Sequence, residues 1–299
     1  MTDNSKNFRS GFIAIVGAPN VGKSTLLNQM LGEKISITSK KPQTTRNRIL
    51  GVVHRPFSQL IFIDTPGIHK ATHPLNVRIV DAALSAIGNV DIILVIVDVA
   101  NPDPKSEAFL VEKLRKRKRS VVLALNKIDL IKKPILLSLI DKWANEYPFE
   151  AIIPISAILG DQIEELLEAM EDLLPKGPLY YPEETLTDLP ERFITAEMIR
   201  EKVFRLTGHE IPYSTAVTVD SFSEEKKDSL VEIHATIHVE RASQKGIIIG
   251  KNGSKLKMIG TEARKEIERM VGTKVFLKLF VRVHKNWSKD TKALRRFGY

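Results

Sequence analysis

The pattern of apolar positions along this chain of 299 residues changes after residue 174. Before that point, short apolar runs alternate with longer segments in which apolar residues recur at helical spacing. The runs at 92–97 and 121–125 are apolar at every position, which is typical of parallel strands buried on both faces. The expected strands are 12–16, 48–54, 60–63, 92–97, 121–125 and 151–155, and the expected helices are 24–31, 75–88, 104–118, 134–146 and 161–173. This alternation predicts an α/β fold with a doubly wound, mostly parallel sheet.

A proline-rich segment, 175–190, follows the last of these helices. It holds four prolines in 16 residues, and proline neither continues a helix nor donates a backbone hydrogen bond. We therefore expect a linker at 175–190 between a first domain, 1–174, and a smaller α+β domain, 191–299. The elements expected in the second domain are a helix at 191–206, strands at 214–221 and 230–240, helices at 244–249 and 254–271, and a strand at 274–284.

The segment 17–24, with the sequence GAPNVGKS, fits the phosphate-binding pattern GxxxxGK[ST] and lies between an expected strand and an expected helix. The N–H groups of such a loop surround phosphate oxygens, and the helix N-terminus favours negative charge. Lys23 is expected to reach the β- and γ-phosphates, and the Ser24 hydroxyl to bind Mg²⁺. The nucleotide contacts predicted here are Gly17, Ala18, Pro19, Asn20, Val21, Gly22, Lys23, Ser24 and Thr25.

The motif DTPG follows the expected strand at 60–63. A carboxylate at Asp64 is placed to hold Mg²⁺, directly or through water, and the Gly67 N–H could bond the γ-phosphate. A threonine that meets Mg²⁺ is expected in the basic segment 39–48, where Thr44 and Thr45 are both candidates. Taken alone, DTPG could be a proline turn and 39–48 an exposed loop. The DTPG motif predicts nucleotide contacts at Asp64, Thr65, Pro66 and Gly67. Together with the segments 17–24 and 39–48, it predicts metal ligands among Ser24, Thr44, Thr45 and Asp64. The same segments predict catalytic roles for Lys23, Thr45, Asp64 and Gly67.

The motif NKID follows the next buried strand and predicts which base is bound. The Asp129 carboxylate can accept both guanine donors at once, and it repels the lone pair at N1 of adenine. Asn126 is expected to brace this loop. Ser156 and Ala157 follow the strand at 151–155, where their backbone N–H groups could meet the guanine carbonyl. The contacts predicted from these two motifs are Asn126, Lys127, Asp129, Ser156 and Ala157.

The residues after DTPG, Ile68 and His69, bear on hydrolysis. Ras-like enzymes place a water-orienting glutamine at the first position, and an isoleucine cannot polarise water. We expect slow intrinsic hydrolysis, or a water positioned by the backbone with a group supplied from elsewhere. Asn20 either helps to hold K⁺ beside the phosphates, as in related families, or braces its loop. His69 is either a general base or an exposed switch residue.

Composition is ordinary for a soluble globular protein, with 43% hydrophobic and 27% charged residues. The chain has no cysteine, which excludes disulfides and Cys-ligated metals and is compatible with a cytoplasmic location. The N-terminal residues show no apolar signal segment. The longest apolar run, 92–97, is far shorter than the roughly 20 residues of a membrane span.

The second domain contains the sequence GKNG at 250–253, between two expected helices. GxxG between helices is the signature loop of KH domains, which clamps about four nucleotides of single-stranded RNA. A plain helix–turn–helix glycine turn is the alternative, but the expected αββααβ order matches the type II KH fold. The predicted RNA contacts are Ile248, Ile249, Gly250, Lys251, Asn252, Gly253, Ser254 and Lys255.

Positive charge gathers in the same domain. Residues 241–299 carry 16 lysines and arginines against 4 aspartates and glutamates, whereas the net charge of the whole chain is +9. Such an excess indicates phosphate binding that weakens with salt. Another basic run, 113–119, either complements a helix C-terminus or contacts RNA. The aromatic residues near the C-terminus could stack on bases or lipid, or pack into the core: Trp287, Phe297 and Tyr299.

The motifs GAPNVGKST, PQTTR, DTPG, NKID, SA and IIIGKNGSKL occur in this order along the chain. The nucleotide motifs together resemble the TRAFAC class of GTPases. With the proline-rich linker and the C-terminal type II KH domain, the whole chain resembles the Era family of bacterial GTPases.

This resemblance implies GTP hydrolysis with Mg²⁺ and binding of the 3′ region of small-subunit ribosomal RNA by the KH domain. It implies a role in assembly of the small ribosomal subunit, with GTP favouring RNA binding and hydrolysis favouring release. It also implies a cytoplasmic protein with a fraction at the inner membrane face, and we expect a monomer. The alternatives are an RNA-binding module with incidental hydrolysis and a membrane-associated regulatory GTPase whose basic tail binds anionic lipid.

Overall fold

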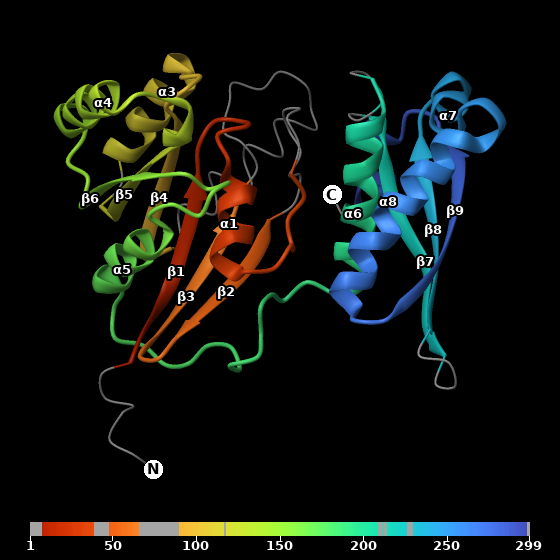
Figure 1. The fold of residues 1–299 in the computed structure, drawn as a ribbon, viewed down its shortest axis with the longest axis horizontal. Coiled ribbons are helices and arrows are strands. Elements are labelled where there is room, and N and C mark those ends of the chain that lie inside the picture. The colour runs from red at the N-terminus through yellow and green to blue at the C-terminus, as the bar shows by residue number, and fades with distance from the viewer. Residues whose placement is uncertain are drawn as a thin grey trace, which may run out of the picture. The chain divides into compact units, whose positions relative to one another are not determined.

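The computed structural model describes residues 8–38, 48–65, 90–116, 118–208, 211, 214–225 and 230–297. The chain divides into two compact units, and the main boundary falls between Asp188 and Leu189. Figure 1 shows the elements of both units. No helix in the described part of the chain has the length and apolar character needed to cross a membrane.

A six-stranded sheet forms the centre of the first unit, with the strand order β2-β3-β1-β4-β5-β6. Every neighbouring pair is parallel except β2 and β3. The prediction of a doubly wound, mostly parallel sheet is therefore confirmed. The winding reverses at β1, so the loop after β1 lies where such sheets bind ligands. The strands are β1 (Arg9–Val16), β2 (Ile49–Arg55), β3 (Ser58–Asp64), β4 (Ile92–Asp98), β5 (Ser120–Asn126) and β6 (Ala151–Ile155).

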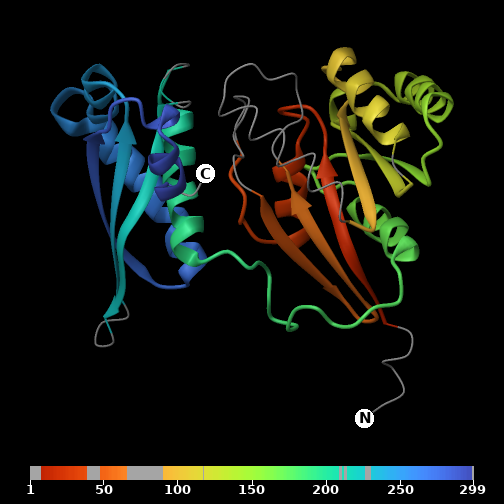
Figure 2. The same ribbon diagram turned by 180° about the vertical axis from the view of Figure 1, so that it is seen from behind.

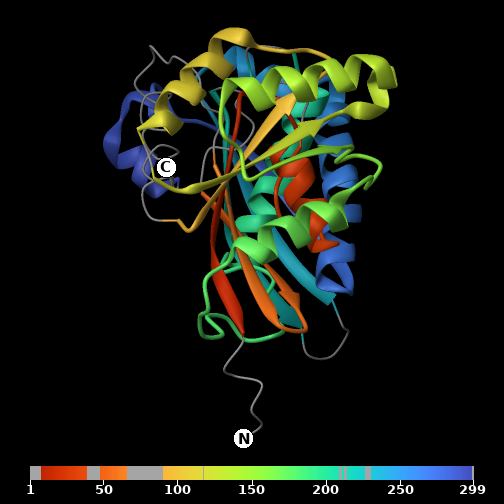
Figure 3. The ribbon, with the colours of Figure 1, turned by 90° about the vertical axis from the view of Figure 1, so that its left-hand side faces the viewer.

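Helices cover both faces of this sheet. On one face, alternate residues of the central strands, such as Val95 and Leu123, pack with Leu110 of α3 and Trp143 of α4. Helices α1 and α5 contact each other and lie against the other face, and Figures 2 and 3 show the layers from two further directions. The predicted helix at 75–88 lies outside the described residues. The helices are α1 (Lys23–Leu31), α3 (Pro104–Arg115), α4 (Lys133–Glu146) and α5 (Ile163–Leu173).

Most of the predicted linker, 175–190, is tied to the first unit. The buried Gln59 side chain donates to the carbonyl oxygen of Tyr181 at 2.7 Å and accepts from the Tyr181 N–H at 3.1 Å. Farther along, the Val52 N–H of strand β2 donates to the carbonyl oxygen of Leu186 at 2.9 Å. The segment therefore runs as a strap along the outer edge of the sheet and supplies partners to backbone groups that the edge strand would leave unpaired.

The second unit is built on a three-stranded sheet with the order β7-β8-β9, in which β8 pairs antiparallel with β7 and parallel with β9. Helices α6 and α8 pack against each other and against one face of this sheet. The predicted αββααβ order is confirmed. The elements are α6 (Glu191–Leu206), β7 (Ala216–Glu225), β8 (Leu230–Val239), α7 (Ala242–Ile249), α8 (Ser254–Val271), β9 (Lys274–Val283) and the short C-terminal helix α9 (Thr291–Arg296).

The C-terminal segment packs onto this unit. The side chain of Trp287, in the short 3-10 turn Trp287–Lys289, is fully buried, and its indole N–H donates to the carbonyl oxygen of Ser214 at 3.0 Å. The Phe297 ring lies 5.3 Å from the Trp287 ring and 4.4 Å from the His238 ring. Trp287 and Phe297 therefore pack into the core and are unavailable for base stacking. Tyr299 lies outside the described residues.

Candidate nucleotide-binding site and nucleic-acid interface

The glycine loop after β1 is shaped by close packing. Gly22 adopts φ 106° as the N-cap of α1, and a Cβ there would lie 2.2 Å from the Asn126 side-chain nitrogen. A Cβ at Gly17 would lie 2.4 Å from the carbonyl oxygen of Ile96. Only glycine fits both positions, because one needs a left-handed backbone and both lack space. The loop therefore keeps its N–H groups around an anion at the helix N-terminus.

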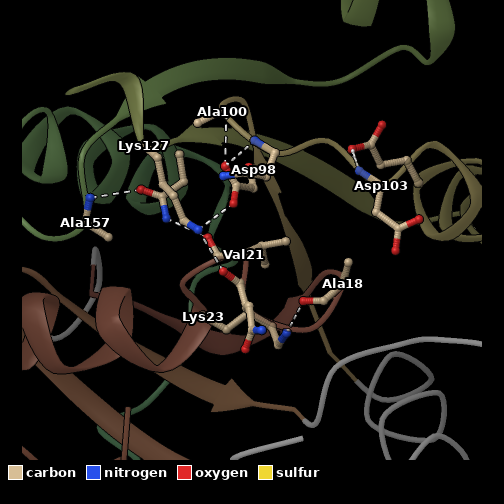
Figure 4. A network of polar contacts seen from close by, with 12 residues as sticks. Ala18, Val21, Lys23, Asp98, Ala100, Asp103, Lys127 and Ala157 are labelled. Carbon is tan, nitrogen blue, oxygen red and sulfur yellow. Dashed lines mark hydrogen bonds and ion pairs between the residues drawn. The ribbon is translucent and has the colours of Figure 1, made fainter. Parts of the chain in front are cut away.

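Lys23 lies across this loop in the first turn of α1. Its ammonium group is buried and donates to the carbonyl oxygens of Gly17 at 3.1 Å and Ala18 at 2.8 Å (Figure 4). Burial lowers the pKa of Lys23 to about 8, and the charge of Asp64 opposes part of that shift. A nucleotide phosphate would favour the charged ammonium, so the side chain is poised to pair with anionic oxygens.

Asp64 lies at the carboxyl end of β3 with no solvent exposure. Its Oδ2 accepts from the Ser24 hydroxyl at 2.7 Å and from the Ser36 hydroxyl at 3.1 Å, whereas its buried Oδ1 has no hydrogen-bond partner among the described residues. Burial raises the pKa of this carboxyl, opposed by Lys23 and the two hydroxyls. A buried, partly unpaired carboxylate beside a serine hydroxyl fits the oxygen ligands that Mg²⁺ requires.

The base-reading loop begins at the end of β5. The Asn126 side chain donates to the carbonyl oxygen of Val21 at 2.6 Å, so it braces the phosphate loop, whereas the prediction was a brace for the base-reading loop. The Ser156 hydroxyl donates to Asp129 Oδ1 at 2.6 Å, which orients a carboxylate that is otherwise exposed. Because a carboxylate has several acceptor positions, Asp129 keeps capacity for the two guanine donors.

The backbone donors predicted for the guanine carbonyl are engaged within the protein. The Ser156 N–H donates to the carbonyl oxygen of Asp161 at 3.2 Å, and the Ala157 N–H donates to Asn126 Oδ1 at 3.0 Å. These bonds hold the loop in its present form. A direct bond from either N–H to guanine would therefore require an exchange of partners, which the sequence did not indicate.

Asp98, at the end of β4, is a member of this network that was not predicted from the sequence. Its carboxylate pairs with the Lys127 ammonium and also accepts from the N–H groups of Ala100 and Asn101, each at 3.0 Å (Figure 4). Lys127 has φ 71° and donates a second bond to the carbonyl oxygen of Asn20 at 2.9 Å. The pair thus links the base-reading loop to the phosphate loop. An acidic residue ending a buried strand was the available signal.

Several predicted site residues lie outside the described residues: Thr44, Thr45, Pro66, Gly67, Ile68 and His69. Within the described part, Thr65 donates its hydroxyl to the carbonyl oxygen of Ile15 at 2.7 Å, so this side chain ties β3 to β1. Thr25 is half-buried in the first turn of α1. Ser36, which the sequence analysis did not consider, joins the site through its bond to Asp64.

The GxxG loop joins α7 to α8 through a short 3-10 turn, Lys251–Gly253. Gly250 has φ 71° and ψ 178°, a conformation that is essentially restricted to glycine. Gly253 has φ 75° and is the N-cap of α8. The side chains of Lys251 and Asn252 between them are exposed, so the loop presents a cation and an amide at the start of a long helix.

A groove with a volume of about 480 Å³ lies beside this loop, between α8 and β9. Leu256 lines it from the helix, and Leu277 and Leu279 line it from the strand. Lys257 and Arg264 add positive charge along the same side of α8. An apolar floor with a basic wall is the arrangement that accepts bases on one side and phosphates on the other.

The structure corrects one predicted RNA contact. Ile248 has no exposed surface, because it anchors α7 in the core, whereas the neighbouring Ile247 is 46% exposed. The groove residues Lys257, Gly260 and Arg264, farther along α8, were missing from the prediction, although their spacing of three and four residues places them on one helix face.

Two protein-family models match separate parts of the chain. A family model described as a 50S ribosome-binding GTPase matches residues 12–127, and a KH domain model matches residues 210–288. The chain is 56% identical to GTPase Era of Geotalea uraniireducens over 98% of its own length and 99% of the relative's. It is 57% identical to GTPase Era of Geobacter sp. strain M21, over 99% of each chain.

Solved structures agree with these matches. Aquifex aeolicus Era, carrying a substitution and bound to GDP and aluminium fluoride, superposes with a TM-score of 0.93 at 39% identity, over 98% of this chain and 99% of that one. A structure of Era with MgGDPNP and nucleotides 1506–1542 of 16S ribosomal RNA gives the same TM-score, the same identity and the same coverage of both chains. Fold and sites therefore define a P-loop GTPase with a C-terminal KH domain. Within this class, the chain belongs to the Era family of GTPases, so the predicted family is confirmed.

Proposed function

We propose that this protein is a GTP-hydrolysing switch that binds the 3′ region of small-subunit ribosomal RNA and assists assembly of the small ribosomal subunit. The observation that carries the proposal is the presence of both sites, a guanine-nucleotide cage and a basic GxxG groove, in one chain. The relative solved with MgGDPNP and 16S ribosomal RNA matches 98% of the chain and supports both ligands. The boundaries proposed are 1–174 for the GTP domain, 175–190 for the linker and 191–299 for the KH domain.

In the first domain, the loop at 17–24 binds the phosphates and Lys23 pairs with their negative charge. Asp129, oriented by Ser156, accepts the guanine N1–H and exocyclic amine. Ser24 and Asp64 would hold Mg²⁺, which neutralises charge on the β- and γ-phosphates during phosphoryl transfer. For this, the Ser24 hydroxyl, which donates to Asp64 Oδ2 at 2.7 Å, must turn its hydrogen away so that an oxygen lone pair faces the cation.

Hydrolysis is expected to be slow without a partner, because Ile68 stands where Ras-like enzymes use a glutamine. Asn20 is proposed to help hold K⁺ beside the phosphates. Its exposed side chain and φ of 64° at the tip of the loop are consistent with this role. Measuring turnover in K⁺ and in Na⁺ tests the proposal, and equal rates in the two salts would remove K⁺ from the mechanism.

In the second domain, the GxxG loop holds the RNA backbone and the groove beside α8 receives the bases. GTP, through Thr44 or Thr45 and the segment that follows Asp64, is proposed to favour the RNA-binding state. A ligand can shift such an equilibrium only by its different affinities for the two states. Binding of GTP and binding of RNA should therefore assist each other.

Turnover of GTP by the purified protein, with and without RNA ending in the small-subunit 3′ sequence, tests this function. We expect the protein to retain guanine nucleotides, to bind this RNA at low salt, and to hydrolyse GTP faster when the RNA is bound. An RNA-binding module with incidental hydrolysis would show the same turnover in both conditions. Failure to bind either ligand would refute the proposal altogether.

A second candidate function is regulation at a membrane surface. The excess of positive charge in 241–299 would also favour anionic lipid. Competition between RNA and anionic vesicles separates the two: RNA should displace the protein from vesicles at low salt if RNA is the main ligand. The protein is proposed to be cytoplasmic and monomeric, with membrane contact only peripheral.

A further inference from the structure

Strand β9 presents two different faces. Its residues at 275, 277, 279 and 281 pair in register with the buried apolar residues of β8 that face helices α6 and α8. The alternate residues point to the opposite side of the sheet. They form a row along the strand, named here the β9 strip: Lys274, Phe276, Lys278, Phe280 and Arg282.

The β9 strip is exposed along its length. Phe276 is 51% exposed and Phe280 is 38% exposed, and the three cations between and beside them are exposed as well. The Lys278 ammonium lies 5.5 Å from the centre of the Phe280 ring. Within the described residues, none of these three cations forms an ion pair. Two exposed rings flanked by cations without ion pairs form a patch of the kind that marks a binding surface.

The carboxylates on this face are held by their own sheet. Glu232, opposite Phe276 in the register, accepts from the His234 ring at 2.9 Å. Asp220 accepts from the Thr236 hydroxyl at 2.6 Å and from the Thr218 hydroxyl at 3.2 Å. These acids are thus engaged by neutral or imidazole donors and do not neutralise the lysines and arginine. The strip remains a row in which cations and aromatic rings alternate.

We propose that the β9 strip is a second RNA-binding surface, on which bases stack against Phe276 and Phe280 while Lys274, Lys278 and Arg282 bind phosphates. Aromatic rings on an open sheet face, interleaved with cations, bind single-stranded nucleic acid with little dependence on sequence. The charge is complementary to a polyanion, whereas a protein partner with an apolar surface would have to desolvate three cations. The inference rests on the proposed RNA-binding function and extends it to another face.

The position of β9 explains how one RNA strand could use both faces. β9 is an edge strand, and Figure 1 shows it at the end of the order β7-β8-β9. Its residues Leu277 and Leu279 line the groove beside the GxxG loop, while the β9 strip lies on the other side of the same strand. RNA longer than the roughly four nucleotides held in a KH groove can pass around this edge.

The test compares a short and a long RNA. The variant Phe276→Thr/Phe280→Thr removes both rings but keeps residues that favour strands. We expect its affinity for a tetranucleotide to remain within about twofold of the unaltered protein. Its affinity for a 12-nucleotide strand should fall by at least about 30-fold, because the stacking of two bases is lost. Phe57→Thr, which removes a 60% exposed ring from the first unit, is the matched control and should change neither.

Each outcome is informative. If the unaltered protein binds neither RNA, the proposed RNA function fails before the strip is tested. If it binds both and the double variant binds the long RNA equally well, the β9 strip is not an RNA surface. For the case in which the double variant loses both RNAs, Phe280→Trp decides: the long RNA, but not the short one, should quench its added fluorescence relative to the unaltered protein. Absence of that quenching would overturn the proposal.

Discussion

The two glycine loops of this protein share a construction and differ in their surroundings. In each, a glycine with positive φ is the N-cap of a helix: Gly22 at 106° before α1, and Gly253 at 75° before α8. Each loop also carries a lysine, Lys23 in the first and Lys251 in the second. Both therefore present a helix N-terminus and a cation to a phosphate group.

The difference lies in what surrounds each loop. Lys23 is buried against carbonyl oxygens of its own loop, and the space beside Gly22 is filled by Asn126. Lys251 is exposed, and a Cβ at Gly253 would meet no atom within 4 Å. A closed loop suits one small ligand of fixed shape, whereas an open loop suits a polymer that enters and leaves from the side.

The largest expected effect is on base selection in the closed site. The substitution Asp129→Asn replaces the carboxylate that accepts both guanine donors by an amide. The amide NH₂ group then faces the exocyclic amine of guanine, so two hydrogen-bond donors oppose each other. GDP affinity should fall by at least about 1,000-fold, and xanthosine diphosphate should bind better than GDP because its C2 carbonyl accepts from the amide. Equilibrium titration with the two nucleotides measures this change in base preference.

RNA affinity of this variant in the absence of nucleotide provides the control, and it should match that of the unaltered protein. Guanine binding that survives the substitution unchanged would show that the base is read elsewhere.

The second effect compares the space available for a side chain at Gly22 with that at Gly253. Asparagine tolerates positive φ better than most residues, so a Gly→Asn substitution tests whether a side chain fits more than whether the backbone is strained. Gly22→Asn would drive its Cβ into the Asn126 side chain, 2.2 Å away, and break the bond to Val21. We expect nucleotide affinity to fall by about 100-fold or more, from strain and the lost brace together.

Gly253→Asn is the matched variant in the open loop. A Cβ at Gly253 meets no protein atom within 4 Å, so the loop should keep its form and the melting temperature of the protein should stay unchanged, whereas Gly22→Asn should lower it. Equal losses of melting temperature in the two variants would remove the distinction between a closed and an open loop.

The third effect follows from the buried lysine. Because the pKa of Lys23 is lowered to about 8, the free protein holds this group neutral above that pH. Phosphate binding favours the charged form, so nucleotide binding above pH 8 must take up a proton. Affinity should therefore fall by about tenfold per pH unit above 8 and level off below it.

Calorimetry near pH 8.5 in buffers of different ionisation enthalpy measures the proton uptake. Lys23→Arg is the control, because arginine stays charged and should bind, however weakly, without this uptake. The same uptake in both proteins would assign the proton to another group.

The smallest effect is the salt dependence contributed by one exposed lysine. RNA affinity should fall steeply as salt increases, and Lys251→Ala should reduce the slope of the log–log plot by about 0.7 for a single strand. Lys265→Ala, at an exposed residue on α8 that pairs with Glu262, is the matched control. A slope unchanged by Lys251→Ala would mean that this loop does not hold the phosphates.

The sequence predicted the elements and the motifs because both depend on local pattern. Strands buried on both faces, such as β4, are continuous apolar runs, and a loop that needs glycine for positive φ shows it at Gly22 and Gly253. The confirmed fold and family follow from these features. Ile248 was misassigned because residues beside a GxxG loop can face either the groove or the core, and only helix orientation decides.

Contacts between distant segments could not be predicted in this way. Asp98 was missed because its partner Lys127 follows another strand, and only the parallel register of β4 and β5, which sets Asp98 beside Asn126, brings the two together. The strap along β2 was predicted only as a linker, because prolines indicate an absence of helix and do not indicate the hydrogen bonds made by Gln59.

The proposed coupling between the closed and the open loop is decided by the affinity for 12-nucleotide RNA, measured with a GTP analogue bound and with GDP bound. Coupling gives tighter RNA binding with the analogue, by about 5- to 150-fold, and an equal gain in analogue affinity when RNA is bound. The same RNA affinity in the two nucleotide states would contradict it and leave two independent binding sites on one chain.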